Sequence, residues 1–297
     1  MENLDYRALA VLDAVVRHGS FEKAALALGI TQSAVSQRVK VLEDSSGRLL
    51  IVRGQPASPT GLGQRLIVHY RHVKLMESAL DIDLGNHVSM PEMAIAMDAD
   101  SLATWFPATM LPLLTPPRCQ LDIRTADSEQ AMQLVREGSV FGCIAAGTDA
   151  LADEVAGTTV TALGLMRYVC VATPMFAGHW FGDGFSAEAV QLAPAAVSDR
   201  RLLERFLHQQ FALVAHFPHH TIPASTALNE AIEGGMAYGL MPLLQVQGAL
   251  ASQRLLDLTP GRCLDLPLQW HAWTLDTPFT KLLSEQIVGS ARRVLLQ

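Results

Sequence analysis

Two kinds of hydrophobic periodicity divide the chain. Up to Gly47 the apolar residues recur at helical spacings, so this segment is predicted to be all helical. From about residue 90 onward, short apolar or β-branched runs alternate with amphipathic stretches, which is typical of α/β units on a largely parallel sheet. The predicted strands are Met93–Met97, Gln120–Arg124, Val140–Ala145, Tyr168–Ala172, Ala195–Ser198, Tyr238–Met241 and Leu268–Thr274. The predicted helices are Ser101–Leu114, Ser128–Glu137, Arg200–Phe211, Ala227–Gly234 and Pro278–Leu295.

A segment that begins at Ser20 has the pattern of a helix, a tight turn and a second helix. Ser20 is a good N-cap for a short helix, and Ala24 and Ala25 are small enough to let a second helix approach closely. Gly29 can supply the positive φ of a helix C-cap, and Thr31 can cap the helix that follows. Together these features predict a helix-turn-helix unit.

The second helix of this unit has one apolar and one polar face. Val35, Val39 and Leu42 recur at helical intervals and form the predicted buried face. The opposite side chains are hydroxyls, amides and cations that can reach base edges or phosphates, as in a recognition helix. A generic solvated helix is the alternative, but the two caps and the polar rather than ionic face favour DNA recognition. The predicted DNA-reading residues of this unit are Thr31, Gln32, Ser33, Ser36, Gln37, Arg38 and Lys40.

Residues 49–60 follow as a predicted two-stranded wing. Pro56 and Pro59 would end its strands, and Arg53 would face a DNA backbone or minor groove. A structural hairpin that covers the helices accounts equally well for everything except Arg53. Arg53 is therefore the one wing residue predicted to bind DNA.

The segment Thr60–Leu84 contains no proline and carries an apolar stripe. Its members are Leu62, Leu66, Tyr70, Val73, Met76 and Leu80. Their spacing of three and four predicts a long helix with one apolar face. That face lies either on its own domain or in a two-stranded dimer seam, and the seam is favoured because the segment has little of its own to pack against.

The charge of the chain bears on which ligands its two parts can bind. The chain has 297 residues, of which 49% are hydrophobic and 17% charged, with a formal net charge of -7, so a disordered protein is excluded and the average disfavours nucleic acid. The charge is uneven, however. Residues 1–80 hold ten Lys and Arg against seven Asp and Glu, a net of +3, whereas residues 81–297 hold twelve against twenty-two, a net of -10. The positive part suits DNA, and the negative part suits a cationic ligand.

The sequence also bears on compartment. The longest charge-free run, Gly234–Gln253, contains Pro242 and several Gln and Gly, so we expect buried soluble structure there and no membrane partner. The first twenty residues leave no apolar stretch for a secretory signal, and the four cysteines lie far apart. A cytoplasmic location is expected, with the cysteines as small core residues.

The N-terminal motifs resemble the signature of LysR-type transcriptional regulators. The matching residues are Ala24-Ala25, Thr31–Arg38, Leu42-Glu43 and Thr60-x-x-Gly63. The remainder resembles the effector-binding domain of these regulators, so the resemblance covers essentially the whole chain. It implies an α+β multidomain fold with an N-terminal winged helix-turn-helix, a long linker helix and a C-terminal two-lobed α/β effector domain similar to periplasmic binding proteins. It also implies sequence-specific binding to double-stranded operator DNA.

Three further motifs resemble the ArgP/LysG branch of that family, whose members respond to lysine and arginine and act on basic amino acid export. These motifs are Asp98–Trp105, Gly138–Gly142 and Leu268–Leu275. The resemblance implies homodimers that join into a homotetramer, and we expect RNA polymerase as a partner at activated promoters. Gly142-Cys143 stands where many family members have an acidic residue, a departure that the branch shares. Gln55 stands at the wing tip where a second basic residue is frequent.

The predicted boundaries follow from these motifs. Residues 1–59 form the winged helix-turn-helix domain, and residues 60–89 form the linker and dimerisation helix. Residues 90–297 form the effector-binding domain, with lobe I at about 90–163 and 266–297 and lobe II at about 164–265. Ligand binding is expected to close or twist the two lobes, and the linker helices to carry the change to DNA.

The ligand site is expected where strands end and helices begin, because helix N-termini present unpaired N–H groups there. Ser101 could cap the first helix of the domain or donate its hydroxyl to a ligand carboxylate. Asp98 and Asp100 could pair with an ammonium or guanidinium group, although acidic residues in a first turn also stabilise the helix dipole. With the branch motif, they favour L-lysine or L-arginine as the effector. The predicted effector-binding residues, each with a possible capping role, are Asp98, Asp100, Ser101, Thr104, Asp127, Ser198, Asp199 and Thr226.

Other functions are less consistent with the sequence. Nucleophile elbows, Walker loops, dinucleotide fingerprints and zinc-protease motifs are absent from the sequence, so we expect no enzyme and no cofactor beyond the effector. His216, His219 and His220 form a tight cluster but are predicted to lie in a solvated loop or at the start of a strand, with no metal. The alternatives are a LysR-type regulator of another metabolite or of a redox signal and, from another class, a solute-binding protein.

Overall fold

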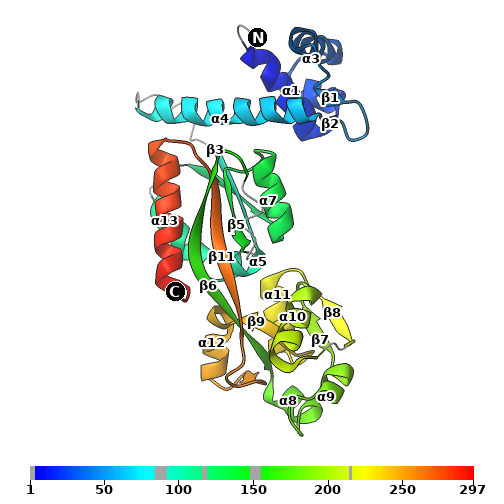
Figure 1. The fold of residues 1–297 in the computed structure, drawn as a ribbon, viewed down its shortest axis with the longest axis vertical. Coiled ribbons are helices and arrows are strands. Elements are labelled where there is room, and N and C mark those ends of the chain that lie inside the picture. Colours follow the sequence, from blue (N-terminus) through cyan, green and yellow to red (C-terminus); the bar gives the residue numbers. More distant parts are fainter. Residues whose placement is uncertain (1–3, 84–91, 116–118, 148–154, 214–215) are drawn as a thin grey trace.

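The computed structural model describes residues 4–83, 92–115, 119–147, 155–213 and 216–297. A small helical unit, a long helix and a two-lobed α/β domain follow one another along the long axis (Figure 1). This is the α+β multidomain arrangement expected from the sequence. The end of the predicted linker, residues 84–89, lies outside the described residues.

The N-terminal unit contains the predicted helix-turn-helix and wing. Its elements are α1 (Tyr6–His18), α2 (Phe21–Leu28), α3 (Gln32–Ser46), β1 (Ile51–Val52) and β2 (Ser58–Pro59). Ser20 and Thr31 cap α2 and α3 as predicted, since each side chain accepts a hydrogen bond from a backbone N–H in the first turn. Ala24 is fully buried, so the neighbouring helices approach α2 closely. β1 and β2 pair antiparallel as the wing.

The long helix is α4 (Gly61–Asp83). Leu66 is buried, and Leu62 and Tyr70 pack against the same core as α1 and the wing. Met76 and Leu80, further along, are 43% and 58% exposed. The first half of the stripe thus packs on its own domain, because α1 and the wing supply apolar partners that the sequence pattern did not reveal. For the second half the dimer seam stays a prediction.

Among the described residues, one seven-stranded sheet runs through the α/β domain. Its strands are β3 (Glu92–Met97), β4 (Gln120–Thr125), β5 (Gly142–Ala146), β6 (Thr158–Ala172), β9 (Gly239–Pro242), β10 (Leu256–Asp257) and β11 (Leu264–Trp273). β3 is parallel to β4 and β5, but β11 is antiparallel to both β5 and β6. The prediction of a largely parallel sheet is wrong, because the chain enters and leaves lobe II through two antiparallel strands. A separate parallel pair, β7 (Ala195–Val197) and β8 (His219–Thr221), belongs to lobe II.

β6 and β11 run from one lobe into the other (Figure 1). Both begin earlier than predicted: β6 at Thr158 instead of Tyr168, and β11 at Leu264 instead of Leu268. Gly164 and a proline lie within the unpredicted parts, and both residue types are unusual in strand interiors. The pattern therefore concealed the two strands that join the lobes.

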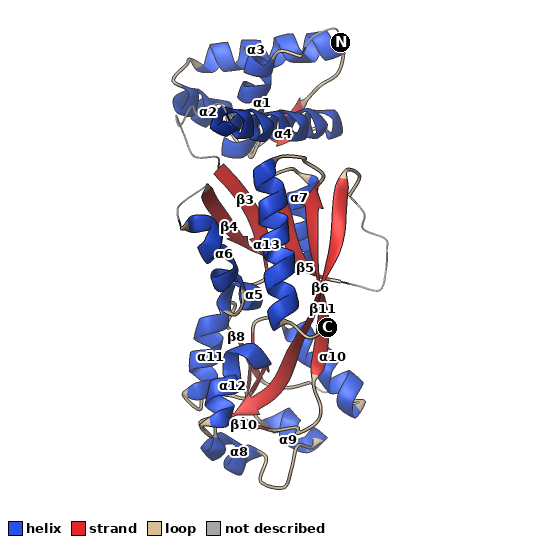
Figure 2. Ribbon diagram, turned by 90° about the vertical axis from the view of Figure 1, so that its left-hand side faces the viewer, coloured by secondary structure: helices blue, strands red, loops and turns tan. Residues whose placement is uncertain are grey.

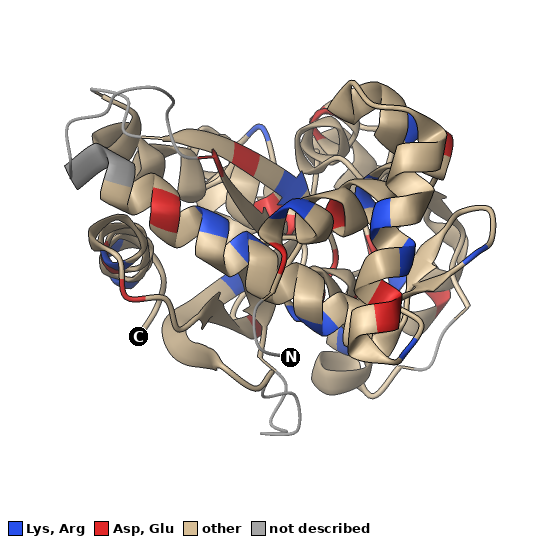
Figure 3. Cartoon of the chain, turned by 90° about the horizontal axis from the view of Figure 1, so that it is seen from above, with Lys and Arg blue, Asp and Glu red and all other residues tan. Residues whose placement is uncertain are grey.

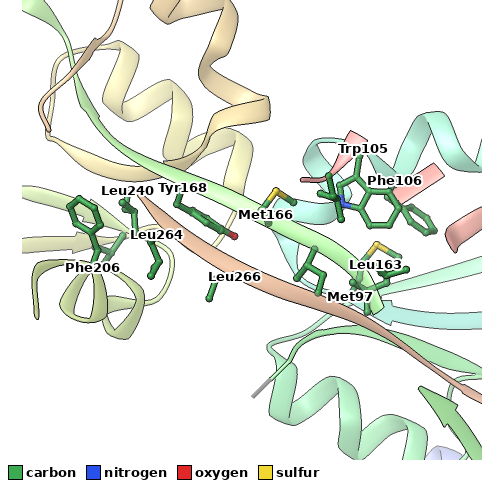
Figure 4. Close-up of a cluster of buried hydrophobic side chains, with 14 of the residues drawn as sticks. Met97, Trp105, Phe106, Leu163, Met166, Tyr168, Phe206, Leu240, Leu264 and Leu266 are labelled. Atoms are coloured by element: carbon green, nitrogen blue, oxygen red, sulfur yellow. The ribbon is translucent and has the colours of Figure 1, made fainter. Parts of the chain in front are cut away.

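The hydrophobic core continues along these two strands from lobe to lobe (Figure 4). Met97 and Trp105 of lobe I and Leu240 and Phe206 of lobe II belong to the same buried cluster. The pairing of β6 with β11 shifts register next to Leu268. A continuous core with one irregular ladder step makes the lobes a connected pair rather than separate domains.

Helices cover both faces of the lobe I part of the sheet (Figures 1 and 2). The lobe I helices are α5 (Ala99–Ala103), α6 (Phe106–Leu114), α7 (Ser128–Arg136) and α13 (Pro278–Val294). The lobe II helices are α8 (Pro174–Trp180), α9 (Ala187–Leu192), α10 (Arg200–Phe211), α11 (Ser225–Glu233) and α12 (Leu243–Ala251). The single helix predicted over Ser101–Leu114 is wrong, because Pro107 cannot continue α5 and starts a new turn in α6. The sequence reading missed α8, α9 and α12.

The described helices include none that is long and apolar enough to cross a membrane. The charge-free run predicted as buried soluble structure contains β9 and α12. The histidine cluster lies at the start of β8, as predicted, with His219 and His220 in that strand.

One contact holds the long helix against the wing and yields a test. Gly63 of α4 lies so close to β1 that an added Cβ would be 2.0 Å from the carbonyl oxygen of Leu50. Gly63→Ala must displace backbone, so we expect a loss of about 1–3 kcal/mol in the free energy of unfolding of the N-terminal unit, measured by urea denaturation. Gly61→Ala on the same helix meets nothing within 4 Å and is the matched control, expected to leave stability unchanged or slightly raised. Equal stability of the two variants would contradict this packing.

Candidate DNA-reading face and ligand cavity

The outer surface of α3 carries the predicted DNA-reading residues. Val35, Val39 and Leu42 are buried on its inner face, as predicted. Gln32, Ser33, Gln37, Arg38 and Lys40 are exposed, and Ser36 is half-buried. The inner face fixes α3 on its core, which leaves its polar side outward along most of the helix.

Most of these polar side chains have no internal partner. Within the described parts of the chain, Gln32, Gln37, Arg38 and Lys40 make no side-chain hydrogen bond or ion pair, so their donors and acceptors are available to a ligand. Thr31 is the exception, because its hydroxyl caps α3 at 3.2 Å from the amide nitrogen of Ala34 and contacts the Ser33 hydroxyl at 3.0 Å. The Thr31 hydroxyl therefore serves to cap α3.

The wing and the start of α3 border one concave surface. A depression of about 680 Å³ is lined by Gln32 and Ser36 of α3, by Arg53 of the wing and by the turn before α2. The Arg53 guanidinium lies 5.6 Å from the ring centre of Phe21. Glu43 keeps the wing on α3 by accepting from the amide nitrogens of Leu50 and Ile51.

The charges at this end of the molecule are mixed. Figure 3 looks down on it and shows Lys and Arg interspersed with Asp and Glu along the helices. The modest excess of positive charge found in the sequence is therefore spread over several elements. Single-site phosphate attraction would be weak, and binding strength would come from several modules acting together.

A cavity of about 1360 Å³ lies between the two lobes. Lobe I lines it with α5, α7 and part of β11, and lobe II with the starts of α10 and α11. The structure brings six of the eight predicted effector residues to its wall: Asp98, Asp100, Asp127, Ser198, Asp199 and Thr226. Ser101 and Thr104 do not line it.

Asp98 and Asp100 form an acidic pair at the start of α5. Asp98 caps the helix, accepting from the Ser101 amide nitrogen and hydroxyl, both at 2.7 Å. Burial, then repulsion from Asp100, raises the pKa of Asp98. Asp100 is buried and accepts from the Tyr168 hydroxyl at 2.8 Å. Two neighbouring carboxylates removed from water in this way would be stabilised by a bound cation.

Ser101 and Thr104 have internal roles instead. Ser101 is fully buried, and its hydroxyl is used by Asp98. The expectation that Ser101 caps the helix is wrong, because Asp98 is the cap, and contact between Ser101 and a ligand stays a prediction. The Thr104 hydroxyl donates to the Asp100 carbonyl oxygen at 2.7 Å within the same short helix.

The other predicted residues lie at helix starts on opposite sides of the cavity. Asp127 caps α7, and Asp199 caps α10 while also pairing with Arg201 at 2.9 Å. Ser198 precedes that cap, and Thr226 lies exposed in the first turn of α11. Asp127 and Asp199 therefore cap their helices and line the cavity at the same time.

Sequence reasoning missed several residues of the wall. Tyr168 comes from lobe II and points toward lobe I (Figure 4), while Gln269 and His271 lie on β11. Arg201 and Arg205 lie on α10. The helix over Arg200–Phe211 was predicted correctly. Its arginines follow the predicted residue Asp199, and this proximity could have indicated that they line the cavity.

The N-terminal unit is joined to lobe I by hydrogen bonds from α4. Arg71 donates to Asp13 of α1 at 2.7 Å and also to the Glu137 carbonyl and the Ser139 hydroxyl at 3.1 Å each, just past the end of α7. Gln64 donates to the same Glu137 carbonyl at 2.5 Å. The linker helix is thus bonded to the C-terminal end of α7, whose last residue, Arg136, also lines the cavity.

Two packing contacts tighten the same junction. Gly138 has φ +58°, and a Cβ there would lie 2.8 Å from a methyl carbon of Val68, so the approach requires glycine. His72 meets the ring of Trp273 edge to face, with 4.5 Å between ring centres. Burial, then the nearby His69, lowers the pKa of His72 to about 4, so this contact is made by a neutral ring at neutral pH.

Three of the four cysteines are core residues, as expected from the sequence, whereas Cys263 is half-buried. Cys119, Cys143 and Cys170 are buried, and all four are free thiols. Burial raises the pKa of Cys143 to about 12 and raises the pKa of the other thiols as well. Such thiols are poor nucleophiles. In the described part of the chain, His, Cys, Asp and Glu form no group of three or more placed to hold a metal ion.

Comparison with known proteins defines the class. A family described as bacterial regulatory helix-turn-helix protein, lysR family, matches residues 6–64. The chain belongs to the LysR family of transcriptional regulators, because full-length members are well above 30% identical to it. The HTH-type transcriptional regulator ArgP of Aeromonas salmonicida is 38% identical over 304 residues, which cover 99% of both chains. The relatives named in these comparisons are regulators of transcription.

Solved structures resemble the chain over its full length. ArgP from Mycobacterium tuberculosis is 33% identical, with a TM-score of 0.87 over 99% of both chains. Full-length LysG from Corynebacterium glutamicum, described with bound effector Arg, is 30% identical, with a TM-score of 0.79 over 99% of this chain and 100% of that one. The winged helix-turn-helix, linker helix and two-lobed domain are thus the architecture of the family.

Proposed function

We propose that this LysR-family regulator reads operator DNA with α3 and Arg53 and senses L-arginine or L-lysine in the cavity between its lobes. The acidic pair Asp98 and Asp100 carries the effector proposal, since two desolvated carboxylates at a cavity wall favour an ammonium or guanidinium ligand. The likeness to LysG with bound Arg and to proteins named ArgP supports it. We infer genes of basic amino acid export or metabolism as targets.

The route from cavity to DNA runs through α7. Asp127 and Ser128 at its start line the cavity, and the residues after its end bond to Arg71 of α4. A nine-residue helix is a rigid connection of about 13 Å. Closure of the lobes on a ligand would shift α7 and, through Arg71, the seating of the DNA-binding domain.

Membership of the LysR family also supports a proposal about assembly and partners. Met76 and Leu80 expose apolar surface on the second half of α4, where a second copy would bury it. A homodimer, joined into a homotetramer, would present paired recognition helices to two half-sites of operator DNA. RNA polymerase is the partner we infer at activated promoters.

The alternatives have less support. A redox signal would need an accessible thiolate, whereas burial raises the pKa of the cysteines. A solute-binding protein would not explain the free polar face of α3. A LysR-type response to a different metabolite remains the alternative that ligand titration decides.

The DNA assignment is tested at two glutamines. Gln32→Ala and Gln37→Ala each remove an amide able to bond a base edge, so each should weaken binding to an operator selected from random DNA by about 1–3 kcal/mol and reduce its selectivity. Gel-shift titration on that operator and on unrelated DNA measures both. Gln209→Ala, an exposed glutamine on α10, is the control. Unchanged affinity and selectivity in the first two variants would contradict the assignment.

The effector assignment is tested by calorimetry. Asp100→Asn keeps an oxygen for the Tyr168 hydroxyl but removes the charge, so the affinity for arginine or lysine should fall by about 2 kcal/mol, roughly 30-fold in Kd. Because a cation binds the ionised pair and the pKa of Asp98 is raised, wild-type affinity should also weaken as the pH falls through that pKa. Asp122→Asn, outside the cavity wall, is the control. Binding of only a neutral or acidic metabolite by the wild type would overturn the proposal.

A further inference from the structure

The two walls of the cavity carry opposite charge. The lobe I wall holds Asp98, Asp100, Asp127 and Glu129 against one arginine, a net of -3. The lobe II wall holds two arginines against Asp199, a net of +1. A ligand that is itself bipolar would lie with its positive groups toward lobe I and its negative group toward lobe II.

The two lobe II arginines differ in availability. Arg201 pairs with Asp199, and its pKa is raised first by that hydrogen bond, with smaller contributions from Asp127 and Glu129 across the cavity. Arg205, one helical turn further along α10, makes no hydrogen bond or ion pair with any residue that the structure describes. A guanidinium at a cavity wall without a carboxylate partner can bind one from the ligand.

The rest of the wall leaves few other places for a carboxylate. The Ser101 hydroxyl, the donor expected from the sequence, is buried and bonded to Asp98. The N-terminus of α11 also faces the cavity, and its cap residue Ala224 has no polar side-chain atom to accept from the first N–H groups. These N–H groups lie in lobe II with Arg205, so both favour an anion on the same side.

We propose that the cavity binds a basic amino acid across the lobes, with its side-chain ammonium or guanidinium at Asp98 and Asp100 and its α-carboxylate at Arg205. This inference rests on the proposed effector class and adds an orientation and a specificity residue to it. Each end of the ligand contacts a different lobe, so the complete amino acid draws the lobes together. An amine that lacks the carboxylate contacts lobe I alone and does not.

The experiment compares lysine with cadaverine, which is lysine without its carboxylate. Calorimetry of the full-length wild type should give lysine at least about tenfold higher affinity than cadaverine, because one charge-assisted contact is lost. In Arg205→Gln this preference should disappear, with lysine affinity falling and cadaverine affinity unchanged. Arg292→Gln, an exposed arginine on α13 outside the cavity wall, should keep the wild-type preference. Arginine and its decarboxylated analogue agmatine give a second pair.

The outcomes separate this inference from the proposed function. If Arg205→Gln keeps the tenfold preference, or if the wild type binds lysine and cadaverine equally, the assignment of the carboxylate to Arg205 is wrong while the basic effector stands. If the wild type binds none of the four compounds, the effector proposal fails and this inference with it. Thermal unfolding of each variant verifies that the exposed substitutions leave the fold intact.

Discussion

A buried carboxylate holds the two halves of this protein in contact. Asp13 lies inside the N-terminal unit, 3% exposed, and is neutralised by Arg17 of its own helix and Arg71 of the linker helix. Removing one partner of a buried ion pair typically costs about 3–5 kcal/mol, so Asp13 favours Arg71 at this position even though Arg17 also pairs with it. Its other guanidinium nitrogen is bonded to the carbonyl of Glu137, at the end of α7 where a cation is favoured by the helix dipole. The Arg71 side chain therefore bonds both to the N-terminal unit and to lobe I.

The α/β domain places a cavity between its two lobes and leads from that cavity to the junction with the linker helix. β6 and β11 carry one hydrophobic core from lobe to lobe, so the lobes are joined through packed side chains (Figure 4). The cavity lies between them, with acidic residues on one wall and arginines on the other. α7 begins at that wall, and the residue after its end, Glu137, is bonded to Arg71 of the linker helix. Trp273 at the end of β11 contacts His72 of the same helix. In the proposed function, these rigid elements couple ligand binding to the geometry of the DNA-binding domain.

The parts that the sequence predicted well are those fixed by local signals. The helix-turn-helix is encoded by its caps, its alanines and the apolar face of α3, all within a short stretch, and helix α10 is encoded by its periodicity and the cap at Asp199. Asp98 and Asp100 were found because a motif singled them out. Nonlocal features were not predictable: the lengths of β6 and β11 depend on pairing across about 100 residues, and Gly164 obscured the pattern. Arg71 looks like an ordinary helical surface residue until the fold places its partners, and Arg205 does so until the fold places it at the cavity wall.

In the proposed function, α7 and Arg71 connect the ligand cavity to the DNA-binding domain. The direct measurement is the ratio of operator affinities with and without saturating arginine or lysine, in full-length Arg71→Lys and Arg17→Lys. Both variants keep a positive charge beside Asp13, but only Arg71 also contacts lobe I. If Arg71 carries this connection, Arg71→Lys still binds operator yet loses most of the effector-dependent ratio, whereas Arg17→Lys keeps it. A wild-type ratio in Arg71→Lys would contradict it.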